Sequence, residues 1–273
     1  MISTITEMMS HMFIQRAILV GTLVSFCAAL LGVSLVLKRY SMIGDGLSHV
    51  GFGILSISTA LGFSTPLYIA IPGVIIFAII LLKLGNNSKI KGDSAIAILS
   101  SSALAIGVAV TSLTTGLNTD VCNFMFGSIL AMSQNDVYLS VIVSIIVVIL
   151  FIVYYRKLFL ITFDEDFARA SGLNAGKYTT LIAILTALII VIGMRMMGTM
   201  LISSIIIFPA LTSMRLFKSF KKVIISSGVV SIVSFLSGIY LSYVYNISAG
   251  ATIVIVNLTM FTVFTIIDKI IHE

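Results

Sequence analysis

Long apolar runs separated by short polar connections are the feature that most restricts what this chain can fold into. A helix needs about 20 apolar residues to cross the ~30 Å hydrocarbon core of a bilayer. Arg195 and two glycines interrupt two of the runs, so the pattern predicts eight or nine transmembrane helices and an all-α, polytopic membrane fold. The runs cover residues 13–37, 43–62, 66–84, 94–116, 137–155, 178–193, 198–214, 223–245 and 248–267.

The composition leads to the same fold class. Of the 273 residues, 59% are hydrophobic and only 10% are charged, and the mean hydropathy is +1.19. Ordinary soluble domains carry about 25% charged residues. So few charges cannot cover a surface that faces water, and we therefore expect one integral membrane domain over residues 1–273, with lipid as its solvent.

The net charge of +6 reflects membrane orientation rather than a nucleic-acid partner. The Lys and Arg residues lie in short clusters between the apolar runs and not along one amphipathic face. With nine helices and an outer N-terminus, every Lys and Arg except Arg16 and Arg195 falls on the cytoplasmic side, as the positive-inside rule requires. The chain is therefore predicted to be a multi-pass protein of the plasma membrane with a cytoplasmic C-terminus.

Asp45 and His49 are the leading candidates for a functional site within the membrane. They are four residues apart in an apolar run, so a helix places both on one face. His49 follows Arg39 by ten residues, or ~15 Å of helix, which puts it near the bilayer midplane. A hydrogen bond between packed helices would be the structural alternative, but burying two titratable groups costs more than such a bond returns. We interpret the pair as ligands of a passing metal ion.

The longest cytoplasmic connection, residues 156–177, predicts a short amphipathic helix on the inner membrane surface. Thr162 or Asp164 can cap its start, Arg169 lies near its end, and Gly172 follows as a terminator. The residues alone leave two interpretations open. The segment is either a solvated connector or a docking surface for a cytoplasmic partner.

Three stretches of the chain closely resemble the permease subunits of ATP-binding-cassette importers for zinc and manganese. They are residues 38–49, which include Asp45 and His49, residues 123–130, and Gly198–Leu201 together with Phe208–Ala210. The resemblance extends over residues 16–265. It implies a fold like that of the type II importers of the ATP-binding-cassette class.

The resemblance also implies roles for particular residues and partners. It favours docking for the inner segment, as a coupling helix at about 162–172 that seats in a groove of a separate ATPase subunit, and it implicates Asp45 and His49 in handling the metal. An extracytoplasmic binding protein would deliver the ion, and a homodimer would place a pathway between two permease chains. The residues matched to the coupling helix are Asp164, Glu165, Asp166, Phe167, Ala168, Arg169, Ala170, Ser171 and Gly172.

No ATPase motif accompanies these features in the sequence. The nearest pattern, residues 172–177, has three residues between its glycines where a P-loop has four, and Tyr178 follows the lysine instead of Ser or Thr. We therefore predict a transport subunit that is not itself an enzyme. It would hold no tightly bound cofactor, and its cargo would be a divalent metal.

One carboxylate and one imidazole are compatible with zinc, manganese or ferrous iron. Zinc is favoured and manganese is a close second. Two ligands are too few for tight coordination, so a second protomer, water or backbone carbonyls must complete the shell. The remaining alternatives are a permease for metal chelates or cobalamin, an ion-coupled secondary carrier in which Asp45 and His49 exchange protons, and, ranked last, an intramembrane hydrolase.

Overall fold

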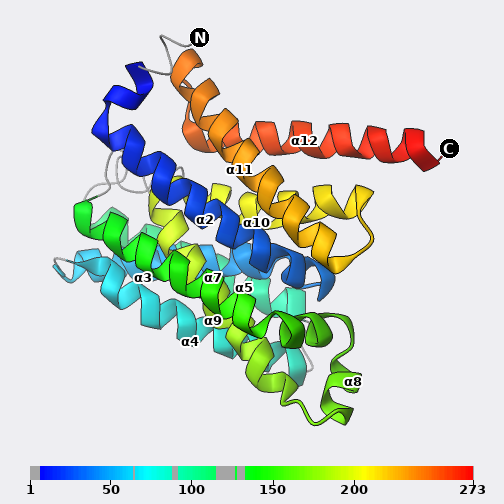
Figure 1. Cartoon of the computed structure of the whole chain (residues 1–273). Helices are drawn as coiled ribbons and strands as arrows, with labels where there is room; N and C mark the ends of the chain where they lie inside the picture. Colours follow the sequence, from blue (N-terminus) through cyan, green and yellow to red (C-terminus); the bar gives the residue numbers. More distant parts are fainter. Residues whose placement is uncertain (1–6, 64, 88–91, 115–126, 128–132, 273) are drawn as a thin grey trace.

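The computed structural model describes residues 7–63, 65–87, 92–114, 127 and 133–272 (Figure 1). No strand occurs among these residues, so the predicted all-α fold class is confirmed. The bounded helices, in chain order, are α2 (Met12–Leu37), α3 (Ile43–Ala60), α4 (Pro66–Asn87), α5 (Gly92–Thr114), α7 (Gln134–Phe163), α8 (Glu165–Ala170), α9 (Ala175–Met197), α10 (Thr199–Leu216), α11 (Phe220–Tyr245) and α12 (Ala249–His272).

Within the described residues, six helices are long and apolar enough to cross a bilayer: α2, α5, α7, α9, α11 and α12. Helices α4 and α10 are also apolar, over Pro66–Leu82 and Leu201–Leu216 of their fully described residues. Helix α3 has 18 residues, but Asp45, His49 and four glycines lower its hydropathy. By length and hydropathy, the described residues therefore show fewer spans than the expected eight or nine, and polar and small residues keep α3 out of the count.

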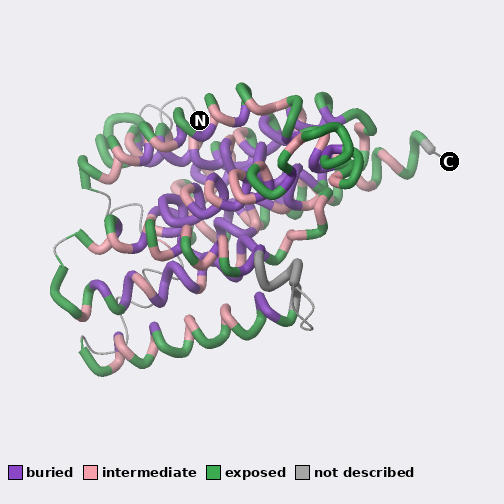
Figure 2. The backbone as a smooth tube through the Cα atoms, turned by 90° about the horizontal axis from the view of Figure 1, so that it is seen from below, coloured by how far each residue is buried: buried purple, intermediate pink, exposed green. Residues whose placement is uncertain are grey.

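The core of the bundle forms around α2 and α9, whose apolar windows are each 72% buried (Figure 2). By contrast, the windows of α5 and α12 are 17% buried and that of α7 is 22% buried. Large apolar side chains such as Ile152 and Val153 of α7 and Ile255 of α12 face outward. A helix that is apolar on its outer face is stable when that face contacts lipid, so these three helices form part of the lipid-facing surface.

Close backbone contact joins α2 to α10. A Cβ atom built on Gly32 would lie 1.9 Å from the backbone oxygen of Ile206, so any side chain there would force the two helices apart. Small residues at helix crossings allow this approach in membranes, where packing rather than water exclusion drives association. Through this contact α10 lies against the centre of the bundle.

The interruption near residue 198 separates two distinct helices. Gly198 ends α9 and begins α10, with φ 88° and ψ 161°, a backbone conformation that is essentially restricted to glycine. This resolves the ambiguity of residues 178–214 in favour of two helices joined by a single residue. Residues 122–132 are too few to span a bilayer, and their sequence predicts a surface or re-entrant helix. They lie outside the described residues, apart from Gly127.

Candidate functional site

Asp45 and His49 converge on one face of α3, as their spacing predicts. The distance between Asp45 Oδ1 and His49 Nε2 is 3.7 Å, which is longer than a hydrogen bond. The His49 side chain is 15% exposed and that of Asp45 is 40% exposed, and the buried His49 Nδ1 has no hydrogen-bond partner among the described residues. The two groups thus approach each other without satisfying each other.

The separation of these two atoms suits a shared metal ion. Two ligand atoms bound ~2.0–2.1 Å from one zinc ion at a tetrahedral angle lie roughly 3.3 Å apart. The observed 3.7 Å is close to that value, so small side-chain movements would let both atoms bind one ion. No group of three or more His, Cys, Asp or Glu residues that could hold a metal occurs in the part of the chain that the structure describes. Asp45 and His49 are therefore two candidate ligands, and they do not form a closed structural site.

Ser203 of α10 is a third polar group at this site, and reasoning from the sequence did not assign it there. Its hydroxyl donates to Asp45 Oδ1 at 3.4 Å and to the Thr199 carbonyl at 3.3 Å. The contact follows from packing, because Gly44 of α3 faces Ser203 and Ile206 of α10 at close range. In the sequence, Gly44 alone indicated this close approach between helices. It did not indicate which helix would supply the partner of Asp45.

Glycines on the other faces of α3 fit the helix tightly against α5. A Cβ on Gly53 would lie 2.7 Å from the backbone oxygen of Ala103. A Cβ on Gly46 would meet the Ile96 side chain at 2.7 Å. Because α3 is packed this closely, the two candidate ligands project from a well-packed helix rather than from a loop.

The inner connection contains the predicted short helix, α8, at one end of the bundle between α7 and α9 (Figure 1). Asp164 is its N-cap and accepts a hydrogen bond from the Phe167 N–H at 2.8 Å. Thr162 belongs to α7 instead, and its hydroxyl donates to the Leu158 carbonyl. Gly172 follows the helix with φ 84°, as expected for a glycine terminator.

Most of α8 faces water, and one side is anchored. Phe167 is 58% exposed, whereas Ala168 is fully buried against Ile161 and Ala175. The predicted span of about 162–172 is therefore slightly longer than the helix, which covers Glu165–Ala170.

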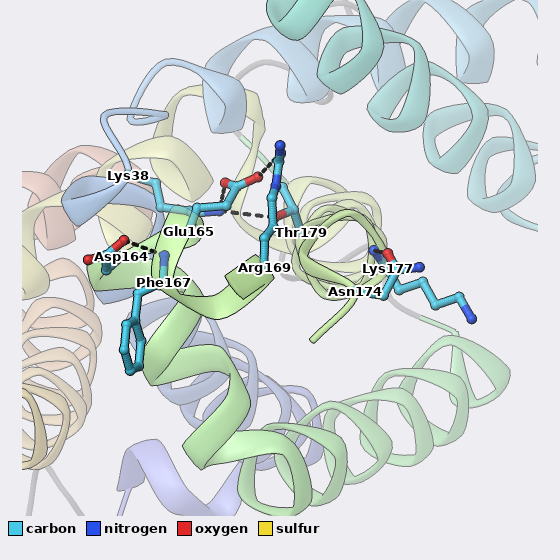
Figure 3. A network of polar contacts seen from close by, with 8 residues as sticks. All are labelled: Lys38, Asp164, Glu165, Phe167, Arg169, Asn174, Lys177 and Thr179. Carbon is cyan, nitrogen blue, oxygen red and sulfur yellow. Dashed lines mark hydrogen bonds and ion pairs between the residues drawn. The ribbon is translucent and has the colours of Figure 1, made fainter. Parts of the chain in front are cut away.

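A polar network fixes the start of α8 (Figure 3). Glu165 accepts from Lys38 Nζ at 3.1 Å through one oxygen and from Arg169 Nη2 at 2.7 Å through the other. Burial alone would raise the pKa of Glu165, but the hydrogen bonds and positive charges of Arg169 and Lys38 outweigh it and hold the pKa below its ordinary value of 4.5. Lys38 also donates to Thr179 Oγ1 at 3.0 Å.

A second ion pair lies at the opposite end of the same helices. Arg195, in the last turn of α9, donates to Asp136 Oδ1 at 2.8 Å, and Asp136 forms a capping box with Ser133 at the start of α7. The Asp136 side chain is only 13% exposed. Its partner is 59 residues away in the sequence, so local sequence pattern does not indicate this ion pair.

A comparison with protein-family models assigns the chain over nearly its whole length. Residues 10–268 match the family described as the ABC 3 transport family. The chain belongs to this family. It is therefore a multi-pass membrane permease of an ATP-binding-cassette transport system, and the resemblance inferred from its sequence motifs is confirmed.

Curated relatives of this ABC 3 family permease carry names that refer to different metals. A protein of Haemophilus influenzae named for iron transport is 34% identical, and the alignment covers 99% of each chain. The manganese import permease ScaB of Streptococcus gordonii is 32% identical over 92% of this chain and 90% of that protein. The zinc uptake membrane protein ZnuB of Haemophilus influenzae is 30% identical over 90% and 94%, respectively.

A solved structure has the same fold as this ABC 3 family permease. A chain of PsaBC from Streptococcus pneumoniae, solved in complex with Fab, aligns with a TM-score of 0.87 and 30% sequence identity. The alignment covers 97% of this chain and 95% of that chain. The permease architecture is therefore shared over the full bundle and not only over the sequence motifs.

Proposed function

We propose that this permease conducts divalent transition-metal ions into the cell and that Asp45 and His49 are their transient ligands. The observation that carries the proposal is the approach of one carboxylate oxygen and one imidazole nitrogen to 3.7 Å, without a hydrogen bond between them. Relatives named for manganese, zinc and iron support the class of cargo. Carboxylate and imidazole together suit all three of these ions.

A site of few ligands matches the requirements of transport. An ion must bind well enough to leave bulk water but weakly enough to be released on the other side. Asp45 and His49, with Ser203 as a neighbour and water completing the shell, meet both conditions. A symmetric second copy of the chain would add an equivalent pair if the pathway lies between two permeases, as we propose for a homodimer.

Zinc is the preferred cargo and manganese is a close second. An imidazole nitrogen favours zinc over the harder manganese ion, whereas the carboxylate accommodates both. A permease for metal chelates or cobalamin is the main alternative. It would need a wide cavity, and it would not need two ligand atoms as close together as those of Asp45 and His49.

The proposed energy source is a separate ATPase subunit that binds α8. The exposed Phe167 and the capped, anchored form of α8 support a docking role for the residues from Asp164 to Gly172. An extracytoplasmic binding protein would supply the ion at the outer face. The ATPase would then alternate the access of the site between the two sides of the membrane.

The test is an uptake assay in vesicles that contain the permease and its ATPase, with radiolabelled zinc, manganese and iron and with ATP present or omitted. Asp45→Ala and His49→Ala should each lower ATP-dependent uptake by more than the ~10-fold typical of losing an outer-shell metal partner. His11→Ala is the matched control, since His11 is exposed near the N-terminus. Normal uptake by both site variants would refute the ligand assignment, and uptake without ATPase would indicate a secondary carrier.

A further inference from the structure

Lys38 is a nearly buried lysine that the proposed metal site and docking surface do not use. It is the C-cap of α2, and its side chain is only 8% exposed. Its ammonium donates to Glu165 of α8 at 3.1 Å and to Thr179 in the first turn of α9 at 3.0 Å (Figure 3). A lysine is rarely buried to this extent unless it is paired, so this ion pair determines where the end of α2 lies.

The two cations that Glu165 binds have different structural consequences. Arg169 lies one turn further along α8 and is 61% exposed, so its contact stays within the helix. Lys38 comes from α2, which is 127 residues earlier in the sequence. Lys38 thus links α8 to α2, in addition to α7 and α9, which flank α8 in the chain.

A short, hydrogen-bonded connection runs from Lys38 to the metal-site helix. The Arg39 N–H bonds to the Val36 carbonyl, the Tyr40 N–H to the Leu35 carbonyl, and the Ile43 N–H to the Tyr40 carbonyl. Arg39 has φ 61°, a left-handed conformation that reverses the chain and is uncommon for a residue with a side chain. Because these bonds leave the connection little freedom, a displacement of Lys38 moves the start of α3, where Asp45 lies in the first turn.

Tyr40 gives independent support for this compact arrangement. Burial raises the pKa of Tyr40, and the negative charge of nearby Glu165 raises it further. The connection between α2 and α3 is therefore within electrostatic reach of the docking helix. Tyr40, whose carbonyl accepts a hydrogen bond from Ile43 at the start of α3, is thus near Glu165 at the start of α8.

We propose that Lys38 is a positioning residue that couples the position of α8 to the position of Asp45. This proposal rests on the function proposed above. When the ATPase displaces α8, Glu165 moves with it. The Lys38 ammonium must follow, because leaving a buried charge unpaired is strongly unfavourable. The connection of residues 38–42 then shifts α3 and changes the access of its two metal ligands.

The test measures the number of metal ions transported per ATP hydrolysed in vesicles that contain the complete transporter. Lys38→Met should lower this ratio by about tenfold, within the usual range of coupling between two sites, while ATPase binding and ATP hydrolysis stay near wild type. Lys38→Arg, which keeps the charge, should restore most of the ratio. A purely structural role would lower binding, hydrolysis and transport together and leave the ratio unchanged.

Lys177→Met is the matched control. Lys177 is exposed in the first turn of α9, and Figure 3 shows its side chain directed away from the Lys38 network. The Lys177→Met variant removes the same charge from the same end of the bundle. Its ratio of metal ions transported per ATP hydrolysed should therefore equal that of the wild type. A tenfold loss in this control would attribute the effect to cytoplasmic charge and overturn the proposal.

A double-mutant cycle tests the pair itself. Once Glu165→Gln is present, Lys38→Met should add little further loss, whereas independent effects would multiply. If Lys38→Met fails to assemble, Thr179→Val removes only a neutral partner of the same ammonium and should still lower the ratio by about threefold.

The assay separates failure of this inference from failure of the proposed function. Absence of ATP-dependent metal uptake by the wild type would refute the function. If the wild type takes up metal and Lys38→Met has a normal ratio, only the role of Lys38 is refuted. The same holds for a normal ratio in Thr179→Val if Lys38→Met does not assemble.

Discussion

The charge of Glu165 determines how firmly α8 is attached to the bundle. Its carboxylate binds Lys38 and Arg169 at the same time, and its pKa lies below the ordinary 4.5. A group whose pKa is lower in the folded chain than in the unfolded chain stabilises the fold above the unfolded pKa. This contribution is lost as the pH falls through the folded pKa.

We expect Glu165→Gln to lower the midpoint of thermal unfolding at neutral pH by roughly 2–4 °C, the shift that about 1 kcal/mol produces in a chain of this size. The difference from wild type should shrink as the pH falls from the ordinary pKa of 4.5 through the lower pKa of the folded chain, because the wild-type carboxylate then becomes neutral as well. Calorimetry of the detergent-solubilised protein at both pH values measures it. Asp166→Asn, which changes an exposed neighbouring carboxylate, should show no difference, and an undiminished gap at low pH would contradict the expectation.

Individual residues differ in how far the sequence could place them. The Asp45 and His49 pair was accessible because helical period alone sets their relation. Ser203 was not, since its contact with Asp45 depends on which helix packs against α3 across a separation of 158 residues. The Lys38 to Glu165 pair was hidden for the same reason. Local spacing predicts neighbours within one helix, whereas contacts between helices depend on packing that a single sequence does not reveal.

At the scale of the helix, close crossings hold the bundle together. Gly32 of α2 touches the backbone of α10 at Ile206, and Gly53 of α3 touches the backbone of α5 at Ala103. A backbone atom cannot rotate away as a side chain can. Substitution at these positions therefore displaces a whole helix and, with it, the residues that the helix carries.

We expect Gly32→Ala to destabilise the protein by at least the ~1–3 kcal/mol usual for an overpacked core, because its Cβ would lie 1.9 Å from the Ile206 oxygen. Gly176→Ala is the control: its Cβ would meet Asn174 Oδ1 at an ordinary 3.6 Å, so its stability should be close to that of wild type. Thermal unfolding in detergent compares the two variants. Equal midpoints for both would disprove the close crossing of α2 and α10.

Helix boundaries followed from the sequence wherever caps and breakers were present. Asp164, Gly172 and Gly198 each mark an end that local chemistry dictates. The number of spanning helices was harder to predict. Helix α3 is polar for a span, and its place in the bundle depends on neighbours that cover its polar groups.

At the scale of the whole molecule, the positions of Lys and Arg predict which end of the bundle faces the cytoplasm. Helix α8 and the connection between α10 and α11 belong to the inner end. The connection between α11 and α12, residues 246–248, belongs to the outer end. Because every Lys and Arg except Arg16 and Arg195 is expected at one end, the positive-inside rule predicts the orientation of the entire chain.

Cysteine labelling of intact cells tests this orientation in a chain whose Cys27 and Cys122 are replaced by alanine. A membrane-impermeant maleimide should label Ser248→Cys from outside and should label Gly176→Cys only after the membrane is opened. Both positions are exposed, so accessibility within the fold does not limit either reaction. Labelling with the reverse pattern would invert the topology and place α8 out of reach of an ATPase.

Helices α7 and α9 are joined to each other at both ends. Helix α8 connects them at one end, and the ion pair of Arg195 with Asp136 connects them at the other. Neither end can splay without breaking an ion pair or unwinding a short helix. We therefore expect a force applied to α8 to displace α7 and α9 together as one stiff body instead of bending them. Mechanical work delivered at the inner face would in this way reach the outer mouth of the transporter, across the full thickness of the membrane.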